Sequence, residues 1–177
     1  MVERYRVVIR GVKPLLMHAP TGIGDTPKLR RGEHLPPEKE AEMYLYRDEE
    51  GVIGIPAINI KAMLRDAGRN YRIRGRKSTY GAMIKAGLDI EPDFIPIRPQ
   101  EWTVDIRPVV VQRQRILRAR PRFDRWELEF VIVNKDPTIL QREMIKRILE
   151  DAGKWYGLGD FRPEFGLFEV KRFEVIQ

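Results

Sequence analysis

DPTILQREMIKRILEDAGKWYGLGDFRPEFGLFEVKRFEVI, residues 136–176, predicts a helix, a glycine-punctuated loop and a strand, in that order. Asp136 suits the N-cap of the helix and Pro137 its first position, where a missing N–H costs nothing. The helix should run over 137–155, because apolar residues recur at steps of three and four and form one stripe. The residues of that stripe are Leu140, Met144, Ile148, Ala152 and Trp155.

The loop after this helix combines glycine, aromatic and basic residues. Gly157 and Gly159 let the chain take positive φ and end the helix. Between Gly159 and Gly166, aromatic side chains and Arg162 stand on a backbone that a ligand can approach closely. Such a loop can hold a phosphate or stack a base, so we assign nucleic-acid contacts to Gly157, Gly159, Arg162 and Gly166. The alternative is a helix cap followed by an ordinary turn.

The remaining patterns predict the sheet that this helix and strand complete. The first strand should span 4–13, with one apolar and one basic face. A helix should run from Pro56 to about Tyr71, and residues 103–117 and 126–133 alternate like the two strands of a hairpin. The order β-α-β-β-α-β indicates an α+β, ferredoxin-like (RRM-like) sheet with helices on one face and the other face left to bind.

Composition sets further bounds on the fold and the chemistry. A chain of 177 residues suits a single domain, 1–177, with loop or subdomain insertions at about 17–53 and 72–102. Without cysteine and with only two histidines, we expect no metal site and no cofactor. No apolar run has the length of a signal peptide or a membrane span, so we expect a cytoplasmic protein without a membrane partner. One serine and three asparagines among many charges resemble the composition of proteins from heat-loving organisms.

The net charge of +7 favours an anionic partner, nucleic acid first. The run 107–125 holds seven arginines against one acid, Asp124. A second run, 68–85, mixes cations with Tyr71 and Tyr80 and has no acid. Proteins that bind a single strand use such a mixture, with cations for the backbone and aromatic rings for the bases. Lys61 and Arg65 add a basic helix face. From the two runs we assign nucleic-acid contacts to Arg72, Arg74, Arg76, Lys77, Arg113, Arg115, Arg118, Arg120 and Arg122.

Two other interpretations of these cations remain open. Net positive charge can merely keep a protein soluble. The arginines can also pair with acids on a neighbouring subunit of a purely structural assembly.

Three segments resemble the RAMP superfamily of CRISPR systems, and within it the backbone subunits that line guide RNA. They are IRGVKPLLMHAPTGIGD (9–25), GIPAINIKAMLRDAG (54–68) and GLGDFRPEFG (157–166). The chain departs from the family where Ala57, Ile58 and Asn59 replace its usual glycine and serine, and where Ala62 replaces a common glycine. The resemblance implies a divergent, even virus-encoded, member that coats single-stranded RNA or DNA. It also implies self-association, or other subunits, within an antiviral ribonucleoprotein.

The resemblance also raises the question of catalysis, because some members of this superfamily cleave RNA. They use a histidine, or an aspartate in the loop after the first strand, where this chain has Asp25. His18 and His34 are the candidate acid–base residues. The alternatives are a turn-capping Asp25 and two surface histidines, so we favour a binding protein. A metal-independent endoribonuclease and a virus-encoded single-stranded DNA-binding protein are the rival functions.

Overall fold

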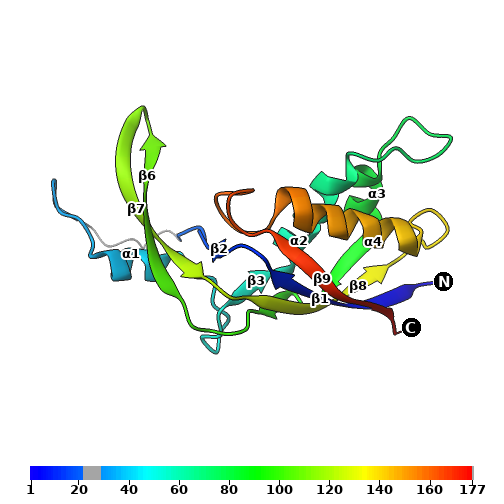
Figure 1. Cartoon of the computed structure of the whole chain (residues 1–177), viewed down its shortest axis with the longest axis horizontal. Coiled ribbons are helices and arrows are strands. Elements are labelled where there is room, and N and C mark those ends of the chain that lie inside the picture. Colours follow the sequence, from blue (N-terminus) through cyan, green and yellow to red (C-terminus); the bar gives the residue numbers. More distant parts are fainter. Residues whose placement is uncertain (22–28, 177) are drawn as a thin grey trace.

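The computed structural model describes residues 1–21 and 29–176 and has a mixed α+β architecture with antiparallel sheets. The main sheet has the strand order β4-β8-β1-β9. Its strands are β1 (Glu3–Gly11), β4 (Leu88–Glu91), β8 (Glu127–Asn134) and β9 (Phe168–Val175). Helices α2 (Ala57–Gly68), α3 (Tyr80–Gly87) and α4 (Arg142–Asp151) cover one face of this sheet (Figure 1). The predicted α+β class is therefore confirmed.

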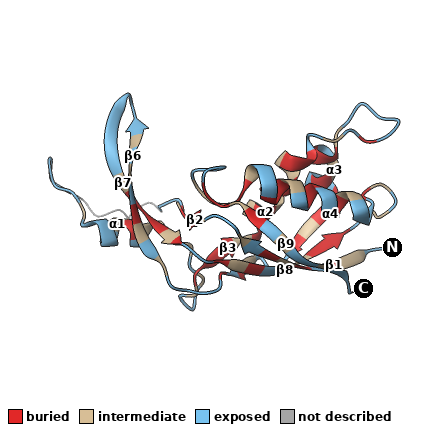
Figure 2. Cartoon of the chain, viewed as in Figure 1, coloured by how far each residue is buried: buried red, intermediate tan, exposed pale blue. Residues whose placement is uncertain are grey.

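The core lies between the main sheet and the helices, where Figure 2 shows most of the buried residues. Tyr5, Val7 and Ile9 alternate along β1, and all three side chains are fully buried. Their partners from the helices are the buried stripes of α2 (Ile60, Met63, Leu64, Ala67) and α4 (Ile145, Ile148, Leu149). Burial of aliphatic side chains on both layers supplies the main driving force for this half of the molecule.

The open face of the sheet is balanced in charge. Side chains of β1 alternate, so Arg4, Arg6 and Arg10 lie on the face opposite Tyr5. Arg4 approaches Glu91 at 3.8 Å, Arg6 approaches both Glu129 and Glu174 at 3.8 Å, and Arg10 bonds Glu127 at 3.0 Å. The expectation of a basic face ready to bind was wrong, because glutamates of the neighbouring strands neutralise these arginines.

A long two-stranded hairpin projects from the main body and rises beside it (Figure 1). It consists of β6 (Thr103–Val111) and β7 (Gln114–Phe123), joined by Gln112 and Arg113, both at positive φ. At its base β7 pairs with β2 (Leu15–Leu16), and α1 (Pro37–Met43) packs against it. The predicted pairing of 103–117 with 126–133 was wrong. The chain reverses inside the first of those segments, at a turn without the usual Asn-Gly or Asp-Gly signature.

Two local details differ from the expected C-terminal helix. Asp136 Oδ1 accepts the Thr138 N–H at 3.2 Å and closes a separate turn, so α4 begins later, at Arg142. After α4 the chain adds a π-helical turn, η1 (Ala152–Tyr156). A wider turn shifts the phase of the following side chains. Trp155, expected in the core, is 63% exposed.

The two segments predicted as insertions differ in structure. The segment 17–53 is mostly irregular, with α1 as the helix among its described residues, whereas 72–102 holds α3 and β4, an edge strand of the main sheet. In the second segment β5 (Phe94–Pro96) pairs with β3 (Gly54–Pro56), the strand that leads into α2. These two strands place the first turn of α2 beside the sheet.

Asn134 is a fully buried polar side chain that ties β8 to the rest of the core. Its amide donates to the Leu140 carbonyl at 2.7 Å and to the Tyr5 hydroxyl at 3.0 Å, and its oxygen accepts the Asp136 N–H at 3.1 Å. Burial, and a hydrogen bond that the Tyr5 hydroxyl donates to Glu3, raise the pKa of Tyr5 to about 12.

Asn134→Ala should lower the free energy of unfolding by about 2 kcal/mol, because it leaves buried hydrogen-bonding groups without partners. Denaturant unfolding measures the loss. Asn70→Ala is the control, since the side-chain hydrogen bond that Asn70 donates to the Tyr156 hydroxyl is exposed and its loss should cost no more than about 0.5 kcal/mol. Equal losses in the two variants would contradict a structural role for Asn134.

Candidate nucleic-acid interface

The loop 157–166, called the glycine loop below, is packed against the segment that leads into and forms β2. The Asp160 N–H donates to the Leu16 carbonyl at 2.8 Å, and the Gly166 N–H donates to the Pro14 carbonyl at 2.8 Å. Gly166 has φ +84°, and a Cβ there would lie 1.8 Å from the Leu158 oxygen. A Cβ on Gly159, at φ +83°, would lie 2.4 Å from the Leu16 oxygen. Close backbone packing therefore explains these glycines without a ligand.

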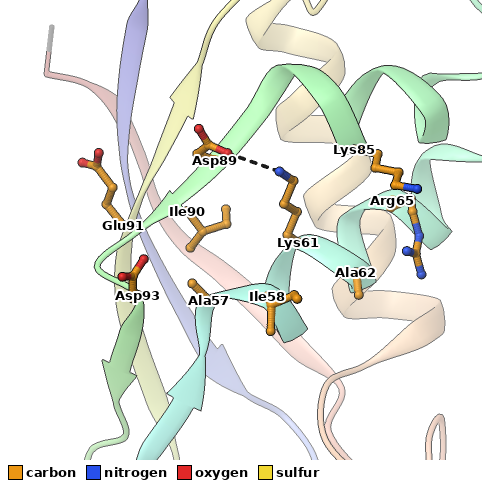
Figure 3. Close-up of a pocket in the computed structure, with 10 residues that line it drawn as sticks. All are labelled: Ala57, Ile58, Lys61, Ala62, Arg65, Lys85, Asp89, Ile90, Glu91 and Asp93. Carbon is orange, nitrogen blue, oxygen red and sulfur yellow. Dashed lines mark hydrogen bonds and ion pairs between the residues drawn. The ribbon is translucent and has the colours of Figure 1, made fainter. Parts of the chain in front are cut away.

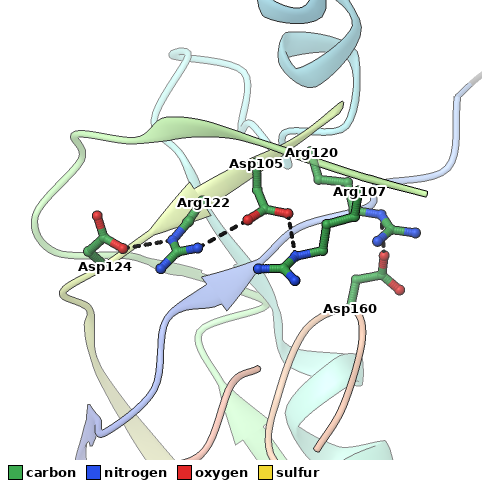
Figure 4. A network of polar contacts seen from close by, with 6 residues as sticks. All are labelled: Asp105, Arg107, Arg120, Arg122, Asp124 and Asp160. Carbon is green, nitrogen blue, oxygen red and sulfur yellow. Dashed lines mark hydrogen bonds and ion pairs between the residues drawn. The ribbon is translucent and has the colours of Figure 1, made fainter. Parts of the chain in front are cut away.

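Asp160 connects the glycine loop to the hairpin. Its Oδ2 lies 2.7 Å from Nε of Arg120, a β7 side chain that is more than nine-tenths buried (Figure 4). The same oxygen lies 3.5 Å from His18 Nδ1. His18 and Arg120 together hold the pKa of Asp160 below its ordinary value, against the opposing effect of burial. The hairpin base is thus held by an ion pair that burial shields from water.

A second carboxylate neutralises two more arginines at the hairpin base. Asp105, which is 7% exposed, lies 2.7 Å from Arg107 Nε and 3.1 Å from Arg122 Nη1. Arg122 also contacts Asp124 at 2.8 Å. Asp124 and then Asp105 raise the pKa of Arg122 (Figure 4). We call Arg107, Arg120 and Arg122 the basal arginines, and each is bound to an acid of its own chain.

Aromatic contacts reinforce the joint between hairpin and glycine loop. The Arg107 guanidinium lies 4.6 Å from the centre of the Phe165 ring, and that of Arg122 lies 5.7 Å from it. The Phe165 ring meets Phe161 edge-on at 5.8 Å. On the other side, Arg118 lies 5.9 Å from the Tyr44 ring, which meets His18 at 4.2 Å. Rings and guanidiniums therefore alternate across the joint, an arrangement that favours stacking contacts.

Two adjoining hollows open beside the glycine loop. The first, of about 240 Å³, is lined by Met17, His18, Tyr46, Ile55, Asn59, Ala62, Leu158, Gly159, Asp160 and Arg162. The second, of about 430 Å³, is lined by Asp66, Trp155, Tyr156, Gly159, Asp160, Phe161, Arg162 and Pro163. They share Gly159, Asp160 and Arg162, so the glycine loop forms a wall of both.

The five arginines predicted on the hairpin divide into two groups. Arg120 and Arg122 are basal and paired. Arg113, Arg115 and Arg118, which we call the distal arginines, form no ion pair with any residue that the structure describes. Arg113 and Arg115 are exposed beside the turn at the hairpin tip. The distal arginines are therefore the cations that this element offers to a partner.

Lys61 and Arg65 border a different hollow, of about 590 Å³, between α2 and β4. Lys61 Nζ lies 3.2 Å from Asp89, and Arg65 Nη2 lies 3.3 Å from Asp66. In Figure 3 Lys61, Arg65 and Lys85 come from the helices, whereas Asp89, Glu91 and Asp93 come from the β4–β5 side. Mixed charge makes this hollow a weaker polyanion site than the hairpin.

The second predicted basic run lies elsewhere on the molecule. Arg72, Arg74, Arg76 and Lys77 are exposed and have no ion-pair partner among the described residues. We call 72–77 the basic loop. It projects between α2 and α3, at the opposite end of the molecule from the hairpin (Figure 1). The structure does not bring the two basic runs together.

The catalytic candidates His18 and His34 have different surroundings. His18 lies at the joint, His34 is exposed, and Asp25 lies outside the described residues. Within the described ranges no cluster of three potential metal ligands occurs. None of the helices described there is long and apolar enough to cross a membrane.

The sequence analysis missed Asp105 and Asp160 as the acids of this joint. Asp105 stands two residues before the basic run 107–125. Asp160 meets Arg120 across 40 positions of chain, so no local spacing could signal their contact.

Comparisons with known proteins show similarity in fold alone. No protein-family model matches the chain, and no curated protein matches its sequence. Among solved structures, the fold is similar to a chain in "Cryo-EM structure of the Type III-B Cmr-beta bound to cognate target RNA", with a TM-score of 0.64 and 15% sequence identity. The match covers 99% of this chain and 61% of that one, so this chain spans less than two thirds of its neighbour's length. At this identity the likeness shows a common fold.

Asp160 predicts a defined pH dependence of stability. Its folded-state pKa lies below that of the unfolded chain, so unfolding takes up a proton and stability is lost as pH falls from about 5 to about 3. Asp160→Asn should flatten this dependence. Near neutral pH it should cost about 2 kcal/mol, since Arg120 loses its counter-ion while one third of Asp160 is exposed to screening solvent.

Denaturant unfolding at a series of pH values measures both effects. The variant should keep part of the pH dependence of the free energy of unfolding, because the pKa values of Asp89, Asp136 and Glu169 are also lowered. The exposed Glu164→Gln is the matched control and should retain the parent profile. An unchanged slope in Asp160→Asn would refute the role given to this pair.

Proposed function

We propose that this chain binds single-stranded nucleic acid, RNA in the first place, along the joint between the hairpin and the glycine loop. The observation that carries the proposal is the position of the distal arginines. Arg113 and Arg115 lie nearer the hairpin tip than the neutralised basal arginines, and Arg118, directly opposite Arg107, forms no ion pair among the described residues. Unpaired guanidiniums on a projecting ribbon suit phosphates, whereas the open sheet face is balanced in charge.

Several features support a divergent RAMP-type protein. The sheet order β4-β8-β1-β9, with α2 after β1 and α4 after β8, fits a ferredoxin-like plan for a single domain. The fold's similarity to a chain of an RNA-bound Cmr-beta structure favours RNA over DNA as the ligand. On the same ground we propose a cytoplasmic ribonucleoprotein, with further copies or other subunits along the strand, and guide RNA as the ligand to test first.

The site residues fall into three groups under this proposal. The distal arginines and Arg162 neutralise phosphates along the joint. The basal arginines and the three glycines hold the joint in shape. The basic loop provides a separate phosphate contact, and Lys61 and Arg65 a minor one because their charges are shared with Asp89 and Asp66.

Binding should weaken as salt rises, and log K should fall against log salt with a slope of about −0.7 for each phosphate neutralised on a single strand. Replacing Arg113, Arg115 and Arg118 together by alanine should make the slope shallower by about 2, as expected for three lost contacts. Fluorescence anisotropy of a labelled single-stranded RNA, titrated at several salt concentrations, measures both slopes.

The matched control replaces Arg6, Arg10 and Arg172 by alanine, which removes the same formal charge from the sheet, where a glutamate pairs with each of these cations. A slope change equal to that of the distal variant would mean that net charge alone drives binding. Salt-independent binding, or none, would refute the proposal and leave the structural assembly protein as the better account.

RNA cleavage is the second candidate function, and one contact favours it. His18 Nδ1 faces Asp160 at 3.5 Å within the smaller hollow, so a carboxylate orients the imidazole as in many acid–base sites. A suitably placed histidine can take the proton of a ribose 2′-hydroxyl. The 2′-oxygen then attacks the adjacent phosphorus, and the bond from phosphorus to the 5′-oxygen breaks.

If His18 acts in this way, RNA should be cut in the presence of EDTA, while DNA, which lacks the 2′-hydroxyl, should stay intact. His18→Ala should abolish cleavage, and the matched His34→Ala should keep it, because His34 is exposed and outside the joint. Gel analysis of end-labelled RNA measures the products. Intact RNA with the parent protein would dismiss this candidate and leave binding unaffected.

A further inference from the structure

We propose that the larger hollow beside the glycine loop binds a nucleobase of the strand by stacking it against Trp155 and Phe161. This inference rests on the proposed function and names a second kind of contact within it. The hollow, of about 430 Å³, falls in the size range of small-molecule sites. It shares Gly159, Asp160 and Arg162 with the smaller hollow, so it continues the proposed track of the strand.

Trp155 is presented to solvent by the π-helical turn that contains it. The Gly157 N–H donates to the Ala152 carbonyl at 2.8 Å and closes the π-helical turn η1, so Trp155 leaves the buried stripe of α4. Its side chain is 63% exposed, whereas Trp126 is 2% exposed. Lys154 Nζ lies 5.0 Å from the indole centre. An exposed indole with an adjacent cation has the chemistry of a base-stacking platform.

Phe161, which also lines the hollow, has a strained backbone conformation. Its φ of 55° lies in the left-handed region, which non-glycine residues rarely occupy unless the surroundings enforce it. The Phe161 carbonyl accepts the Phe165 N–H at 3.1 Å, and the two rings are in contact. Phe161 remains 43% exposed, so this local strain places an aromatic ring at the rim of the hollow.

The charges of the hollow favour a nucleotide. Its two acids have partners of their own: Asp160 is bound to Arg120, and Asp66 lies 3.3 Å from Arg65 and 3.4 Å from Arg69. Arg162 is exposed and has no ion-pair partner within the described part of the chain. Two aromatic rings and one uncompensated guanidinium match the base and the phosphate of a single nucleotide unit.

The experiment compares an oligouridine RNA with an abasic oligomer of equal length, which keeps the phosphates and lacks the bases. The protein should bind the oligouridine about tenfold more tightly, because a stacked base strengthens binding by roughly this factor. Its tryptophan emission should be quenched only by the oligomer that carries bases. Trp155→Ala should reduce the preference to less than about twofold and remove the quenching, while the slope of log K against log salt stays unchanged.

Trp102→Phe is the matched control, because the Trp102 ring packs partly buried against the core and should keep both preference and quenching. Phe161→Leu is the second variant and should weaken the preference without changing the fold, as judged by circular dichroism. Equal affinities for the two oligomers, or a full preference in Trp155→Ala, would overturn the base site while salt-dependent binding stands. Absence of binding to either oligomer would remove the proposed function and the base site together.

Discussion

The structure depends on two carboxylates, Asp105 and Asp160, that take up the charge of the basal arginines. A guanidinium as buried as that of Arg120 is stable only when an acid accompanies it. Asp160 belongs to the glycine loop, so the ion pair that neutralises Arg120 also connects the hairpin to the loop and to His18. Backbone bonds from the loop to Pro14 and Leu16 extend this connection to the base of β2.

Neutralisation at the base determines what the rest of the molecule can offer to a polyanion. The formal charge of +7 overstates the positive charge that is available to a polyanion, because the arginines of β1 and the basal arginines already face carboxylates. The distal arginines, Arg162 and the cations of the basic loop are among the cations that have no such partner in the described chain. Position, more than net charge, is therefore the property that makes this protein a candidate nucleic-acid binder.

Short-range patterns predicted much of the fold, and long-range pairing accounts for the errors. Tyr5, Val7 and Ile9 alternate clearly enough to place the first strand, and Ile60, Met63 and Leu64 mark the buried side of α2. The strand 103–117 was too long because the turn at Gln112 and Arg113 carries no glycine. The site was harder, since Asp160 reaches Arg120 only after folding, and a one-residue phase shift in η1 turned Trp155 outward.

The placement of the hairpin and the basic loop at opposite ends of the molecule has a mechanical consequence. A protein with two cationic ends is bivalent toward a flexible polymer: once one end is engaged, the other meets the same polymer at a raised effective concentration. Short oligomers engage one end at a time, whereas a longer strand can span both. Ligand length, independent of sequence, then becomes a source of selectivity that is built into the shape of the chain.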